Sequence, residues 1–143
     1  MFSKSCKYAI RAVFYLATYA SEEVKLGVDD LAEKLSVPKH FLAKILQTLV
    51  RNRLVSSAKG RRGGFYLSEE NKKSNLLSVI ECIDGPGTFT TCILGLAKCS
   101  NETPCPYHRS VKKYRDKFYD LVASESIEES AKRIKSQNLK LKI

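Results

Sequence analysis

The chain has 143 residues, of which 43% are hydrophobic and 28% are charged. This length and composition are typical of one globular domain and exclude a disordered chain. The longest apolar run, from Ala12 to Ala17, is far shorter than the about 20 residues of a membrane span, so a transmembrane helix is excluded. Lys4 and Lys7 precede this run as in a signal peptide, but Arg11 interrupts it. We therefore expect a mature cytoplasmic helix.

Basic residues are in excess and are clustered. Lysine and arginine number 25 against 15 acidic residues, which gives a formal net charge of +10. Such an excess favours nucleic acid first and an anionic membrane second. The stretch from Pro38 to Tyr66 has no acidic residue and contains Lys39, Lys44, Arg51, Arg53, Lys59, Arg61 and Arg62. Because a solvated surface usually mixes both signs, this stretch is a candidate nucleic-acid-binding segment.

Three helices are predicted before the basic turn. Apolar residues recur at helical spacing from about Ser5 to Ala20. A short helix from Asp29 to Leu35 begins with carboxylates, which suit the positive end of a helix dipole. A third helix runs from Pro38 to Asn52 with one apolar stripe. On or beside its other face lie Lys39, His40, Ala43, Lys44 and Gln47. Basic and amide groups on a helix anchored in the core suit major-groove recognition.

A basic β-hairpin follows the third helix. Short strands are predicted at Leu54 to Ser57 and at Phe65 to Leu67. The glycine-rich turn between them contains the cations Lys59, Arg61 and Arg62. Two helices followed by such a hairpin make a winged helix-turn-helix, so the predicted fold is mainly α. We expect the three cations to reach phosphates or the minor groove, the alternative being an ordinary surface turn.

The C-terminal part contains one short and one long predicted helix. The short helix runs from Leu76 to Ile83 and stops at a Gly-Pro-Gly turn. The long helix begins near Tyr107, and apolar residues recur in it with a period of about 3.5, namely Val111, Tyr114, Phe118, Leu121 and Val122. We expect this seam to pack against a second copy of the chain. The tail from Gln137 to Ile143 alternates lysine with leucine and isoleucine, and is either frayed or part of the interface.

The predicted organisation has three parts. Residues 1–85 form the winged helix-turn-helix, residues 86–106 form a cysteine-bearing loop, and residues 107–143 form the dimerisation helix and tail.

The five cysteines fall into two groups. Their odd number argues against a disulfide framework. Cys6 and Cys82 have apolar helical surroundings and are expected in the core. The other three lie in the loop with a nearby histidine, in the order Cys92, six residues, Cys99, five residues, Cys105, two residues, His108. Three thiolates and an imidazole are a complete ligand set for zinc or an iron–sulfur cluster, the alternative being unrelated cysteines.

The sequence resembles the bacterial Rrf-type winged-helix regulators, which include an iron–sulfur cluster regulator, a nitric-oxide-sensing repressor and a cysteine-metabolism repressor. The resemblance extends from residue 5 to about residue 125. The matching stretches are Lys7 to Ala12, Leu31-Ala32 with Phe41-Leu42, Leu54 to Ser57 with Gly60 to Leu67, and Ile80-Glu81 through Asp84-Gly85-Pro86 into the three loop cysteines.

The resemblance implies a homodimer in which a long helix crosses to the other subunit. It also implies an iron–sulfur cluster, 2Fe–2S in preference to 4Fe–4S, held by Cys92, Cys99 and Cys105, with His108 as the candidate fourth ligand. Two features depart from the family. The first cysteine interval is one residue longer than expected. The recognition helix presents different residues, so a relative's target sequence does not transfer.

These observations together predict a dimeric DNA-binding transcriptional regulator, controlled by a cluster that senses redox state, nitric oxide or iron–sulfur status. Lys39, His40, Lys44 and Gln47 are expected in the major groove of a palindromic duplex operator, with no membrane partner.

A thiol-switch regulator or a zinc-containing regulator is the first alternative. An RNA-binding zinc protein is less favoured, because few aromatic residues accompany the basic stretch. An enzyme is not expected, because the chain has two histidines and no nucleophile–base motif.

Overall fold

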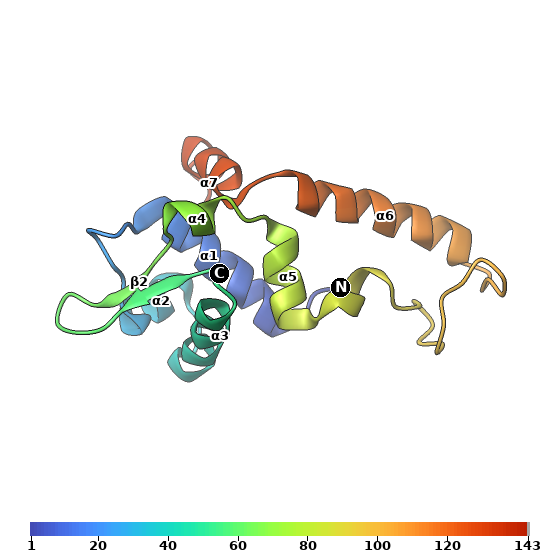
Figure 1. The fold of residues 1–143 in the computed structure, drawn as a ribbon, viewed down its shortest axis with the longest axis horizontal. Coiled ribbons are helices and arrows are strands. Elements are labelled where there is room, and N and C mark those ends of the chain that lie inside the picture. The colour runs from blue at the N-terminus through green and yellow to red at the C-terminus, as the bar shows by residue number, and fades with distance from the viewer. Residues whose placement is uncertain (143) are drawn as a thin grey trace.

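The computed structural model describes residues 1–142 and is mostly helical, with one two-stranded antiparallel sheet (Figure 1). The elements are α1 (Lys4–Tyr19), α2 (Val28–Leu35), α3 (Lys39–Arg51), β1 (Ser56–Ala58), β2 (Gly64–Tyr66), α4 (Glu69–Lys72), α5 (Leu76–Asp84), the 3-10 turn η1 (Pro86–Phe89), α6 (His108–Ser124) and α7 (Ile127–Ser136). This confirms the predicted winged helix-turn-helix. Over residues 1–142, none of these helices combines the length and apolar character of a membrane span.

Helix α1 is the centre of the core. Ser3 caps its N-terminus by accepting a hydrogen bond from the Cys6 backbone N–H at 3.0 Å. Its buried face packs with the apolar faces of α2 and α3, in a cluster that includes Leu16, Leu42 and Leu46. Because a fully buried leucine contributes about 1.5–3 kcal/mol, this packing fixes α3 with its polar face outward.

The wing begins two residues later than the sequence predicts. Arg53 has a left-handed backbone (φ 57°), and the two residues after it, Leu54 and Val55, are buried as anchors in the core. Pairing therefore starts at Ser56, which lies opposite Tyr66. Phe65 also exchanges two backbone hydrogen bonds with Leu26, at 2.7 and 3.0 Å. These bonds attach the base of the wing to the α1–α2 connection.

Asn71 joins the end of α3 to the start of the wing, and the sequence did not indicate this role. It lies in the short helix α4, which was also not predicted, and its side chain is buried. Its Oδ1 accepts from the Ser56 hydroxyl at 2.7 Å and from the Ser68 backbone N–H at 2.9 Å, and its Nδ2 donates to the Arg53 carbonyl at 2.8 Å. One side chain thus fixes where the wing leaves the recognition helix.

We predict that Asn71→Ala lowers the free energy of unfolding by about 1–3 kcal/mol, because its partners lose their hydrogen bonds in a buried place. Urea denaturation measures this loss. The matched control is Asn52→Ala, since the Asn52 side chain is exposed and bonds only to Thr48 of its own helix. It is expected to change stability by less than about 0.5 kcal/mol. Equal losses in the two variants would contradict the role given to Asn71.

The C-terminal helix is two helices, which corrects the prediction of one long helix from Tyr107. Helix α6 ends at Ser124, and Ser126 begins α7 with a capping box in which its hydroxyl and the Glu129 carboxylate each accept a backbone N–H. The first helix packs against α5 and η1 in a second core cluster that contains Cys6, Phe89 and Val122. The second helix packs on α1. Of these two helices, α6 is the one that extends away from the main core around α1 (Figure 1).

Candidate DNA interface and cysteine site

The outward face of α3 carries the residues predicted to enter the major groove. Lys39, His40, Lys44 and Gln47 are all exposed, whereas the apolar stripe of α3 is buried. The Lys39 ammonium lies 2.6 Å from the Asp29 carboxylate, and both side chains are more than half exposed. Because exposed ion pairs contribute at most about 1 kcal/mol, Lys39 remains available to bind another anion.

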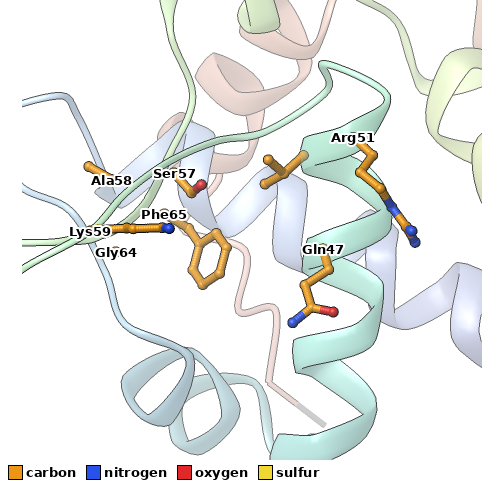
Figure 2. A pocket seen from close by; sticks show the side chains of 8 residues that line it. Gln47, Arg51, Ser57, Ala58, Lys59, Gly64 and Phe65 are labelled. Atoms are coloured by element: carbon orange, nitrogen blue, oxygen red, sulfur yellow. The ribbon is translucent and has the colours of Figure 1, made fainter.

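A groove of about 490 Å³ separates α3 from the wing. Gln47 of α3 and Phe65 of β2 lie on facing sides of it, and Lys59 lies at the wing side (Figure 2). Arg51 also lines the groove from the last turn of α3. Arg51 belongs to the clustered cations of the sequence, but no role was predicted for it. Its place one turn after Gln47 on the same helix is the signal that could have identified it.

The tip of the wing is charged and exposed. Lys59, Arg61 and Arg62 are all exposed around the turn between β1 and β2. Gly64, at the start of β2, has φ +144°, and an added Cβ would lie 2.7 Å from the Leu26 carbonyl oxygen. Only glycine allows this close approach. The three predicted wing cations therefore project from a hairpin whose base is fixed.

The cysteine loop, residues 90–107, lies at the end of the molecule opposite to the wing (Figure 1). Its first donor pair is Cys99 and His108, with the sulfur 3.3 Å from Nδ1. The other ring nitrogen of His108 lies 2.9 Å from the Asn101 side-chain oxygen, so both ring nitrogens have partners. His108 is buried at the start of α6. The second partner fixes the orientation of the ring, as outer hydrogen bonds do for metal-binding histidines.

The second pair is Cys92 and Cys105. The backbone amides of Leu94 and Leu96 lie where they lower the pKa of Cys92, and the nearby Cys105 side chain acts in the same direction. Burial of Cys92 opposes this shift, and the positive charge of Arg115 adds to it. A sulfur that accepts several N–H groups is stabilised as the thiolate, which is the form that binds metals.

Arg115 lies between the two pairs and was not predicted from the sequence. Its Nη2 donates to the Cys99 sulfur at 3.3 Å and its Nη1 donates to the Thr91 carbonyl. It follows His108 by seven residues, which is two helical turns on one face of α6. That spacing is the signal that could have placed Arg115 beside the cysteines.

The four donor side chains have the chemistry of ligands for a metal centre that prefers sulfur. Three thiols and one imidazole are ligands that zinc and iron–sulfur clusters use. Across residues 1–142, no three His, Cys, Asp or Glu side chains are grouped closely enough to hold a metal ion. The four donors thus form two adjacent pairs, and a bound centre requires the pairs to approach each other within the loop.

The other two cysteines lie outside this loop, as predicted. Cys6 is fully buried, and burial raises its pKa to about 12. Cys82 is half-buried against the core, where burial also raises its pKa. Both are therefore poor thiolate donors.

Comparisons with known proteins identify the family. The sequence profile of the Rrf2 family, described as iron-dependent transcriptional regulator, matches residues 2–133. A protein of Aquifex aeolicus named as an HTH-type transcriptional regulator is 31% identical over 131 residues, 90% of each chain. In fold, the chain is similar to CymR, the global cysteine regulator of B. subtilis, with a TM-score of 0.75, 21% identity and coverage of 93% of this chain and 97% of CymR. It is also similar to T. potens IscR, with a TM-score of 0.73, 19% identity and coverage of 97% and 91%. The chain belongs to the Rrf2 family of transcriptional regulators.

Proposed function

We propose that this chain is a homodimeric DNA-binding regulator whose affinity for a palindromic operator is set by an iron–sulfur cluster. The observation that carries the proposal is the arrangement of the cysteine loop, in which Cys99 pairs with His108 and Cys92 pairs with Cys105. These four residues would hold the cluster. The family description as iron-dependent supports this choice of metal. The cluster would supply a centre whose bonding changes with redox state, nitric oxide or iron supply, and we favour 2Fe–2S over 4Fe–4S.

The chain's own residues connect the cysteine loop to α6. The His108 backbone N–H donates to the Cys105 carbonyl at 3.0 Å, and its side chain contacts Cys99. Any rearrangement of the two pairs therefore moves the first turn of α6. A coupling of about 1–3 kcal/mol between this loop and the DNA-binding surface would change affinity about 5- to 150-fold.

DNA recognition is assigned to the two exposed basic surfaces. The α3 surface, formed by Lys39, His40, Lys44 and Gln47, would contact base edges in the major groove. The wing surface, formed by Lys59, Arg61 and Arg62, would contact phosphates or the adjacent minor groove. Gln47 and Phe65 line the groove between these two surfaces, and one DNA backbone would pass there between helix and wing.

Dimerisation is assigned to the face of α6 that points away from its own core. Tyr114 and Leu121 are 59% and 60% exposed, although both are large apolar side chains. With Phe118 they border a groove of about 510 Å³. A second copy of α6 would cover these residues, and the resulting two-fold symmetry matches a palindromic operator.

A thiol switch is the second candidate, and the proximity of Cys105 to Cys92 favours it. Two adjacent thiols can form a disulfide by losing two protons and two electrons to an oxidant. The similarity in fold to CymR, a cysteine regulator, is equally consistent with this mechanism. A zinc site with the same four ligands is a further variant.

One experiment distinguishes these candidates. Protein purified without oxygen is assayed for iron, sulfide and zinc, and its absorption spectrum is recorded. We expect a coloured protein with equal amounts of iron and sulfide. A DNA duplex selected from a random library should bind this protein, and the affinity should change when the iron is removed. About one zinc per chain in a colourless protein would support the zinc site. A metal-free protein that cannot be reconstituted would favour the thiol switch.

The DNA assignment makes a separate prediction about salt. Changing Arg61 and Arg62 together to Ala should reduce the slope of log affinity against log salt by about 1.8, since each phosphate contact contributes about 0.9. Fluorescence anisotropy with a duplex probe measures this slope. Changing Lys132 and Lys135 together to Ala removes the same charge from α7, and this control should leave the slope nearly unchanged. Equal slopes for both double variants would reject the wing contacts.

A further inference from the structure

Arg115 is a cation without a carboxylate partner in the described part of the chain. Lys112, on the same helix, pairs with Asp116 at 2.6 Å, but Arg115 takes part in none of the ion pairs of residues 1–142. Its Nε is buried and has no hydrogen-bond partner there. Because a partly buried charge is costly unless it is balanced, another group must act as the counter-charge of this guanidinium.

The groups that face Arg115 are the sulfurs of the cysteine loop. The guanidinium hydrogen-bonds to Cys99 and lies close enough to Cys92 for its charge to act on that sulfur. Its remaining bond goes to the Thr91 carbonyl, next to Cys92 in the chain. A planar guanidinium can hold a sulfur and a carbonyl at the same time in a fixed geometry, which the flexible lysine ammonium does less well.

We propose that Arg115 is a positioning residue of the cysteine site, which fixes Cys99 and the Thr91–Cys92 segment against α6 and provides the counter-charge for their sulfurs. The first part concerns the metal-free protein. The second part rests on the proposed cluster, whose sulfur ligands carry negative charge. Through this residue the cysteine loop contacts α6 two turns beyond His108, so that loop and helix move as one body.

The metal-free protein tests the first part. In Arg115→Met, hydrogen exchange of backbone amides in residues 90–107, followed by mass spectrometry, should be at least about fivefold faster than in the unaltered protein, because protection depends on local opening. Arg115→Lys should recover part of this protection. Arg109→Met is the matched control, since Arg109 is exposed on the same helix. Unchanged exchange in Arg115→Met, or an equal increase in Arg109→Met, would overturn the positioning role.

The iron-loaded protein tests the counter-charge. A nearby positive charge favours the reduced, more negative form of a cluster, so Arg115→Met should have a more negative midpoint potential. Arg115→Lys should stay near the unaltered value, which a purely structural role would not produce. Equal potentials for Arg115→Met and Arg109→Met would overturn the counter-charge. If no variant binds iron, the proposed cluster fails, whereas the exchange experiment still decides the positioning role.

Discussion

Cys99→Ser will leave the protein without iron and sulfide after anaerobic purification, whereas Cys82→Ser will retain the full amount. The physical reason is the position of Cys99, which contacts both His108 and Arg115 and thus lies at the centre of the donor set. A serine hydroxyl is a hard, weakly acidic group and replaces a soft thiolate poorly. Colorimetric iron and sulfide assays and the visible spectrum measure the loss.

Cys82 is a suitable control because it undergoes the same substitution but is not one of the four proposed ligands. It lies on α5, outside the cysteine loop, with its sulfur 4.0 Å from the Thr48 carbonyl. Circular dichroism should show both variants folded. Retention of a cluster in Cys99→Ser would contradict the ligand assignment, and loss of the cluster from both variants would mean that the effect is not specific to the loop.

Leu121→Asp will convert the proposed dimer to a monomer and lower operator affinity by at least about 100-fold, because two linked half-site contacts would become one. Leu121 is exposed on the outward face of α6 beside Tyr114. A carboxylate there would be buried without a partner in a helix-to-helix seam, which is strongly unfavourable. Analytical ultracentrifugation measures the oligomeric state, and anisotropy with the selected duplex measures affinity.

Leu121→Met is the matched control, because it keeps an apolar side chain of similar volume and should preserve the dimer. A Leu121→Asp protein that sediments as a dimer would exclude this face of α6 as the interface. A monomer that binds the operator with unchanged affinity would instead separate dimerisation from DNA recognition.

The N-terminal half of the fold was predictable because its helices alternate clear apolar and polar faces. The predicted limits of the first three helices agree with α1, α2 and α3 to within one residue. The wing was predictable from glycine and cation spacing, but its first strand was placed two residues early. The backbone of Arg53 is left-handed where the next two residues, Leu54 and Val55, enter the core. This conformation depends on tertiary packing, which the local sequence does not indicate.

The C-terminal half was predicted less well. The apolar spacing that predicts the long helix ends at Val122, and the prediction placed no break between this point and the tail at Gln137. The signal for the break was present, since Ser126 followed three residues later by Glu129 is a capping-box pattern. The sequence of the tail does not distinguish a frayed end from a packed one. The structure shows that Leu141 packs on the core, where its carbonyl accepts a hydrogen bond from Arg11 at 3.0 Å.

The candidate site could be predicted as a set of residues but not as an arrangement. Spacing identified the four donors, and it carried no information on which of them pair. The roles of Arg115 and Asn71 depend on contacts between segments that are distant in the chain, 16 residues for Arg115 with Cys99 and 18 for Asn71 with Arg53. The spacing from His108 places Arg115 on the same face of α6, but no periodicity or motif in a single sequence specifies its contact with Cys99 or the contact of Asn71 with Arg53.

Helix α6 is attached to other segments at both of its ends, so a change of its tilt affects both. Its 17 residues span about 25 Å at about 1.5 Å each, so a tilt of about 5° displaces one end by about 2 Å. One end is fastened to the cysteine loop. At the other end, Asn75 donates to the Ala123 carbonyl at 3.1 Å, and the Ile127 N–H donates to Ser74 at 2.8 Å. Ser74 in turn bonds to Asn71, the residue that holds the wing. Under the proposed regulation, a small rotation of α6 at the cysteine loop would be transmitted through these bonds to the base of the wing.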